Sequence, residues 1–301
     1  MKKTLLNRNT LLILSLVLGL AGGWGVDFFK LFTLYVLALV MIFSATSFDF
    51  KHLKDYKFFA KTTFISFLLN YIAFGIIILT AAYFIIDEKE LFWGFVAIAA
   101  TPPGIVIIPF TFIYKGNTNF SLIGVLGVYL LSIIASPLII KLFVKDASVD
   151  TFALIRVTIE VIIIPILLSR LLLFKKIKPL IEKMRGQVVN WGFAIIIYTI
   201  VGLNREAIFS ELDLVFKISL VLFITMFVVG FLYEKITRKF IKRETRISHN
   251  LMLTLKSSGY AAGLALVVFG ERSALPAAFL AVFVLLYLIL AGFLFEKEKI
   301  I

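Results

Sequence analysis

Ten long apolar runs dominate this 301-residue chain and leave only short polar connections between them. A membrane-spanning helix needs about 20 mostly apolar residues, so ten of them would use roughly two thirds of the chain. The residues are 61% apolar and 16% charged, whereas about a quarter of a soluble domain is charged. We therefore expect an all-α polytopic membrane protein with no sizeable domain outside the membrane. The predicted spans are residues 10–26, 31–48, 58–86, 91–114, 119–144, 151–174, 189–204, 212–234, 246–270 and 274–295.

The basic residues are distributed unevenly between alternate connections. Most of the 31 lysines and arginines lie at the two termini and after the second, fourth, sixth and eighth spans. This asymmetry is what the positive-inside rule describes, so we expect a multi-pass protein of the cell inner membrane with both termini in the cytoplasm. No aromatic-interleaved basic motif accompanies these residues, so the expected partner is membrane lipid and not nucleic acid.

Ten spans divide into two halves of five, and an odd number per half inserts the second half upside down. This is the inverted-repeat plan of many secondary transporters. The fourth and ninth spans occupy corresponding places and carry Thr101-Pro102-Pro103-Gly104 and Lys256-Ser257-Ser258-Gly259. The proline pair frees backbone carbonyls and the Ser-Ser-Gly run weakens a helix, so both spans are predicted to break. Paired breaks indicate a transport site, although simple kinks remain the alternative.

Two polar residues stand out inside the spans. A lysine near the membrane centre costs about 2.5–3.5 kcal/mol on insertion scales, and Lys256 lies about ten residues into its span. Either it snorkels to an interface, or it provides a protonatable centre in a polar pocket. Asn70 is the other isolated polar group, and it either joins two helices by a hydrogen bond or belongs to the site.

Several classes of chemistry lack their residues in this chain. The absence of cysteine excludes disulfides and thiolate metal sites, and the two histidines, His52 and His249, lie in locally polar stretches. The chain has no metalloprotease, hydrolase-elbow or ATP-binding motif, so we expect no enzyme, no cofactor, no metal and no ATP-driven pump. A transporter driven by a gradient remains.

Residues of the fourth and ninth spans resemble those of a known family. The segment from Pro102-Pro103-Gly104 to Lys115-Gly116-Asn117 resembles the Pro-Gly-Gly to Arg-Gly-Asn stretch of the bile acid:sodium symporter family. The segment from Ser258-Gly259 to Phe269-Gly270 is similar to that family's Asn-Ser-Gly helix and Phe-Gly turn. The resemblance extends over essentially the whole chain, which looks like a divergent, bacterial-type member.

This resemblance implies a two-domain fold. Helices 1, 2, 6 and 7 would form a panel (residues 1–48 and 151–204), and helices 3–5 and 8–10 a core (residues 58–144 and 212–295) in which helices 4 and 9 cross. Family members carry small organic anions in the groove between panel and core, usually with two sodium ions. The implied substrate-binding or coupling residues are Lys256, Asn70, Ser257, Ser258, Ser121, Pro109 and Thr111.

The departures from the family pattern concern the sodium ligands. Sodium needs several oxygen ligands. At the family's ligand positions this chain has Ile107-Ile108, Val125 and Met252, which supply no side-chain oxygen, while Asn70 and Lys256 replace two glutamines. We therefore expect a secondary active transporter or facilitator of a small organic anion that is sodium-independent. Its Lys256 would substitute for the coupling cation by donating to freed carbonyls and to Asn70, with the proton as the candidate coupling ion. The alternatives are a sodium-coupled symporter and, from other classes, an ion channel or an intramembrane enzyme.

Overall fold

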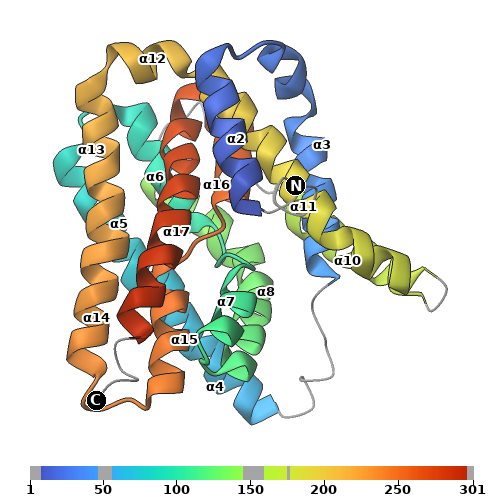
Figure 1. Cartoon of the computed structure of the whole chain (residues 1–301), viewed down its shortest axis with the longest axis vertical. Helices are drawn as coiled ribbons and strands as arrows, with labels where there is room; N and C mark the ends of the chain where they lie inside the picture. The colour runs from blue at the N-terminus through green and yellow to red at the C-terminus, as the bar shows by residue number, and fades with distance from the viewer. Residues whose placement is uncertain (1–7, 47–55, 145–158, 175–176, 297–301) are drawn as a thin grey trace.

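The computed structural model describes residues 8–46, 56–144, 159–174 and 177–296, which form helices joined by short connections (Figure 1). The predicted all-helical fold is confirmed for this part of the chain. The predicted spans 31–48 and 151–174 and the outermost residues of the predicted domains lie partly outside the described residues. The elements are α2 (Arg8–Ala21), α3 (Val26–Ala45), α4 (Tyr56–Phe67), η2 (Leu68–Ala73), α5 (Phe74–Ile85), α6 (Lys89–Ala100), α7 (Ile107–Ile113), α8 (Thr118–Phe143), η3 (Ile159–Ile163), α10 (Ile164–Leu171), α11 (Lys178–Leu203), α12 (Arg205–Ser210), α13 (Leu212–Phe223), η4 (Ile224–Val228), α14 (Val229–Thr237), α15 (Arg243–Thr254), α16 (Ser258–Phe269) and α17 (Glu271–Glu296).

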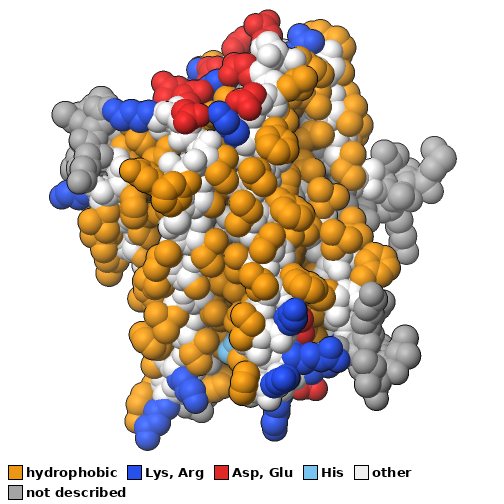
Figure 2. All heavy atoms as spheres, turned by 90° about the vertical axis from the view of Figure 1, so that its left-hand side faces the viewer, with side chains coloured by type: hydrophobic (Ala, Val, Ile, Leu, Met, Phe, Trp, Pro, Cys, Tyr) orange, Lys and Arg blue, Asp and Glu red, His pale blue; other side chains and the backbone are white. Residues whose placement is uncertain are grey.

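Six of the described helices are long and apolar enough to cross a membrane by themselves. They are Val26–Ala45, Tyr56–Ile85, Thr118–Phe143, Lys178–Leu203, Leu212–Thr237 and Glu271–Phe295. The other predicted spans correspond to α2, to η3 with α10, and to the pairs α6–α7 and α15–α16, which are shorter or interrupted. Large apolar side chains cover the face formed by α5, α13 and α14 (Figure 2), with Phe84 78% and Phe216 65% exposed. Lipid would cover such a surface.

The described helices pack as two groups (Figure 1). One group consists of α2, α3, α10 and α11, in which α11 packs along both α2 and α3. In the other, α6 packs against α5, α8, α16 and α17. Close approach within the first group needs a glycine, because a Cβ at Gly192 of α11 would lie 2.1 Å from Val40 of α3.

Two long helices contain π-helical turns at their centres. The turn η2 joins α4 to α5, and η4 joins α13 to α14. These helices correspond to the third and eighth of the predicted spans. π-Helical turns are frequent at functional sites, and η2 carries Asn70.

Helix α11 begins earlier than the sequence pattern predicts. Its first residue is Lys178, whereas the predicted span starts at residue 189. Pro179 lies in the first turn, where its missing N–H removes no intrahelical bond. The difference arises because the apolar run marks only the part of a helix that can contact lipid. The helix itself also includes the charged stretch before residue 189, from Lys178 through Arg185.

The two ends of the molecule carry different charges (Figure 2). At one end Arg272 pairs with Glu88 (2.7 Å) and Glu211 (2.6 Å), and Lys217 pairs with Asp87 (2.8 Å). The hydrogen bond from Lys217 holds the pKa of Asp87 below its usual value. At the other end most charged side chains in Figure 2 are basic. The apolar surface therefore lies between two polar ends.

Candidate functional site

Two broken helices meet at the centre of the second group. Helix α6 ends at Ala100 and α7 begins at Ile107, while α15 ends at Thr254 and α16 begins at Ser258. Both predicted breaks are therefore present in the structure. The extended residues between the half-helices pair through an antiparallel bridge between Pro103 and Lys256. Because prolines cannot donate, the pairing uses neighbouring amides: Gly104 N donates to Leu255 O (3.2 Å) and Ser257 N to Pro102 O (3.1 Å).

The ammonium of Lys256 is buried beneath this crossing and is not snorkelling. The side chain is 1% exposed. Its Nζ donates to the carbonyls of Ala99 (3.0 Å) and Thr101 (2.7 Å). It also lies 4.2 Å from the centre of the Tyr71 ring and 5.3 Å from that of Phe74, where cation–π attraction is favourable. Among the described residues it has no carboxylate partner, so carbonyl dipoles and ring faces are the groups that would stabilise a positive charge on Nζ.

The other carbonyls freed by the break are also paired. Tyr71 Oη (2.9 Å) and Ser136 Oγ (2.6 Å) both donate to Ala100 O. The hydroxyl of Thr101 donates to Ile98 O (2.8 Å). Buried backbone acceptors are costly when left unpaired, so these side chains make the broken helix stable. The sequence analysis did not propose Tyr71 or Ser136 for the site. Tyr71 directly follows Asn70 and Ser136 directly precedes Pro137, and neither position by itself predicts a hydrogen bond to Ala100 O.

Asn70 lies against the same crossing but does not contact the ammonium in the expected way. Its Nδ2 donates to Met252 O (2.9 Å), with a longer contact to Leu255 O (3.5 Å). Lys256 Nζ and Asn70 Nδ2 are both hydrogen-bond donors here, and each donates to different carbonyls. The expected hydrogen bond between them is therefore wrong, and within the described chain Asn70 Oδ1 is buried without a hydrogen-bond partner.

The predicted residues Thr111 and Ser121 form a separate buried pair. Their hydroxyls lie 2.8 Å apart, and Thr111 Oγ1 also donates to Ile107 O (2.7 Å). This pair joins α7 to α8. The structure thus brings Lys256 and Asn70 together at the crossing and places Thr111 with Ser121 one helix away.

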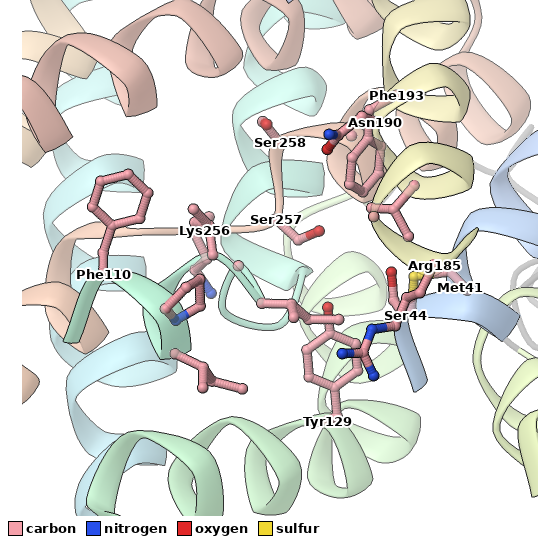
Figure 3. A pocket seen from close by; sticks show the side chains of 18 of the residues that line it. Met41, Ser44, Phe110, Tyr129, Arg185, Asn190, Phe193, Lys256, Ser257 and Ser258 are labelled. Atoms are coloured by element: carbon pink, nitrogen blue, oxygen red, sulfur yellow. The ribbon is translucent and has the colours of Figure 1, made fainter. Parts of the chain in front are cut away.

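A cavity of about 770 Å³ lies on the other side of the crossing, between the two groups of helices (Figure 3). The predicted residues Pro109, Ser257, Ser258 and Lys256 line it, and Asn70, Thr111 and Ser121 do not. Pockets for small ligands range over about 300–1,000 Å³ and are mostly apolar with a few polar groups. The size and lining of this cavity therefore suit a small organic molecule.

One face of α11 forms the wall that the sequence analysis missed. Its members share a spacing of i, i+1, i+4, i+5 and i+8, and are Arg185, Gly186, Val189, Asn190 and Phe193. Figure 3 shows Arg185, Asn190 and Phe193 along this helix, with Tyr129 of α8 and Met41 and Ser44 of α3 also lining the cavity. The helical stripe was a usable signal, but the predicted boundary at residue 189 left Arg185 in a loop.

No described residues form a cluster typical of a metal site. Groups of three or more histidine, cysteine, aspartate or glutamate side chains that could hold an ion do not occur in the ranges described. At the crossing, Ile107 and Met252 are fully buried and provide no side-chain oxygen. The polar atoms available there are hydroxyls, one amide and backbone carbonyls.

Long apolar helices around two interrupted helices that pair beside a cavity are typical of multi-pass membrane transporters. The model of the SBF-like CPA transporter family (DUF4137) matches residues 13–297, so the chain belongs to this family. The family resemblance predicted from the sequence is thereby confirmed.

The names of two relatives agree with this class. The chain is 25% identical over 219 residues to the "Uncharacterized sodium-dependent transporter YocS" of Bacillus subtilis (strain 168), covering 71% of this chain and 66% of that protein. It is 24% identical over 211 residues to the "Probable sodium/metabolite cotransporter BASS1, chloroplastic" of Arabidopsis thaliana, covering 68% of this chain and 52% of that protein. The chain thus spans between about half and two thirds of the length of these relatives.

Proposed function

We propose that this protein is a secondary transporter of a small organic anion that works without sodium, with Lys256 as a tethered substitute for the coupling cation. The observation that carries the proposal is the buried ammonium of Lys256, which donates to the carbonyls of Ala99 and Thr101. An ammonium and a sodium ion have the same charge and both bind carbonyl oxygens. A lysine in this place makes an external cation unnecessary for holding the broken helices together, and its proton is the candidate link to a proton gradient.

Matching interruptions support an inverted repeat of two five-helix halves. The third and eighth predicted spans carry the π-helical turns η2 and η4, and the fourth and ninth are broken. Symmetric features of this kind are typical of transporters whose site lies at the repeat interface. In this proposal α2, α3, α10 and α11 form the panel, the remaining long helices form the core, and the substrate binds in the cavity between them.

Charge supports an anion as substrate. Of the described residues that line the cavity, the ionisable ones are Arg185 and Lys256, and both have basic side chains. The N-terminus of α16, where Ser257 and Ser258 line the cavity, adds positive electrostatic potential. A cation would meet like charge in this cavity, so an organic anion is the better fit.

Sodium coupling is the second candidate, because the names of both relatives refer to sodium. The buried Oδ1 of Asn70 and Oγ of Ser66, both without a partner in the described chain, are two oxygen atoms that an ion could use. Against this, Met252, Val125 and Ile107 are buried with no side-chain oxygen, and the ammonium already holds two carbonyls of the crossing. A second positive charge close to Lys256 would be repelled.

Uptake into proteoliposomes tests the proposal. A panel of labelled monocarboxylates, from lactate to 2-naphthylacetate, is offered with sodium on both sides and again with choline in its place. We expect at least one monocarboxylate to enter faster than into protein-free liposomes, at a rate that does not change when choline replaces sodium. A strict sodium requirement would favour the symporter, and no uptake of any anion would contradict transport of this substrate class.

A further inference from the structure

We propose that Arg185 binds the anionic group of the substrate and sets a preference for ligands with one negative charge. This inference rests on the proposed function and assigns a residue and a charge to it. Arg185 lies on the cavity face of α11 and is half-buried.

The guanidinium of Arg185 is unusual among the arginines of this protein. Within the described chain it forms no hydrogen bond and no ion pair. The other arginines whose side chains are described have partners: Arg272 pairs with two carboxylates, Arg246 with Glu234, and Arg243, Arg170 and Arg205 donate to backbone carbonyls, while Arg238 also interacts. A guanidinium with five donors and no acceptor is therefore available in the cavity.

The surroundings of Arg185 make an oxyanion the fitting partner. The other described residues of the cavity include many apolar side chains, among them Met41, Val106, Phe110 and Val189, and no carboxylate is found among them. A charge beside an apolar wall is stabilised when an opposite charge joins it, because the electrostatic attraction grows as water is displaced. The planar fork of arginine matches a carboxylate or sulfonate through two parallel hydrogen bonds. The Nζ of Lys256 already donates to the carbonyls of Ala99 and Thr101, so one guanidinium remains to balance one negative charge.

Two neutral polar groups lie farther along the cavity. Asn190 follows Arg185 by five residues on α11, a rise of about 7.5 Å at 1.5 Å per residue. Ser258 also lines the cavity, is 7% exposed, and its hydroxyl forms no hydrogen bond within the described residues. In Figure 3, Asn190 and Ser258 lie at the level of Phe193, whereas Arg185 lies at a different level of α11. The arrangement fits a ligand with an anionic head at Arg185, an apolar body, and a hydrogen-bonding group toward Asn190 and Ser258.

Binding to the purified full-length protein tests the role of Arg185 separately from transport. The probes are 2-naphthylacetate, its neutral amide 2-naphthylacetamide, and naphthalene-2,6-dicarboxylate, measured by titration calorimetry in detergent. The variants are Arg185→Gln, which removes the charge, and Arg185→Lys, which keeps the charge without the fork. Lys183→Gln is the matched control, because it removes one exposed charge from the same turn of α11 outside the cavity.

For the parent protein and Lys183→Gln we expect the monoanion to bind about tenfold or more tightly than the amide, and also more tightly than the dianion. In Arg185→Gln this preference for the monoanion over the amide should vanish, and in Arg185→Lys it should be partly kept. If Arg185→Gln keeps the full preference, the assignment to Arg185 is wrong while the proposed function stands. If the parent protein prefers neither anion over the amide, the assignment to Arg185 is wrong, and the uptake panel decides separately whether the proposed transport of anions fails as well.

Discussion

Replacing Lys256 by alanine is expected to destabilise the protein by about 3–5 kcal/mol and to reduce anion uptake to background. The substitution leaves the carbonyls of Ala99 and Thr101 without their donor, and each buried unsatisfied group costs about 1–3 kcal/mol. It also removes the cation above the Tyr71 ring and opens a cavity under the crossing. Thermal unfolding in detergent and uptake into proteoliposomes measure the two effects.

Two further variants separate the charge of Lys256 from its volume. Lys256→Met keeps most of the volume but donates no hydrogen bond, so it should resemble the alanine variant in uptake. Lys256→Gln keeps two donors and should recover part of the stability. Lys141→Ala on the exposed side of α8 is the control, because it removes a lysine at the membrane surface and should change neither quantity. If Lys256→Ala unfolds and transports like the parent, the lysine plays no part in the site.

Breaking the buried ion pair between Arg246 and Glu234 should have a similarly large effect on stability. Arg246 is 3% exposed and Glu234 6% exposed, and Arg246 also donates to Ile241 O (3.1 Å). Removing one member of a buried pair leaves an uncompensated charge, which typically costs about 3–5 kcal/mol. We therefore expect a large loss for Arg246→Leu and for Glu234→Leu, measured by thermal unfolding in detergent.

The double variant makes this prediction specific. Replacing both charges by leucine removes the desolvation cost along with the attraction, so Arg246→Leu with Glu234→Leu should lie much closer to the parent than either single variant. Because this pair links α14 to α15 and does not line the cavity, the folded double variant should still transport. Additive losses in the double variant would show that the pair is not the source of the effect.

The helical breaks were predictable because their causes are local. Pro102 and Pro103 remove two consecutive backbone donors and so disfavour a continuous helix, and an isolated lysine within an apolar span needs a buried partner or a path to water. The partners of Lys256 were only half predictable. The freed carbonyls follow from the prolines. The direction of the Asn70 amide depends on the path of the π-helical turn η2, and the run of apolar residues around Asn70 does not show where such a turn occurs.

Arg185 and Arg246 show why charged residues at span ends were misplaced. Both belong to basic stretches that the positive-inside rule explains well. Hydropathy left Arg185 outside the predicted span 189–204 and placed Arg246 at the first residue of the predicted span 246–270. In the structure Arg185 faces the cavity from an extended α11, and Arg246 is buried against Glu234. Charge counts along a sequence indicate a side of the membrane, whereas burial depends on how far a helix continues past its apolar run.

The melting temperature as a function of sodium tests most directly whether Lys256 takes the place of the cation. Sodium chloride is titrated against choline chloride at constant ionic strength, for the parent protein and for Lys256→Gln combined with Met252→Glu, which provides a carboxylate and removes the tethered charge. Any ion that binds only the folded state raises the melting temperature. We predict no sodium-specific rise for the parent and a rise for the double variant. A sodium-specific rise in the parent protein would contradict the account.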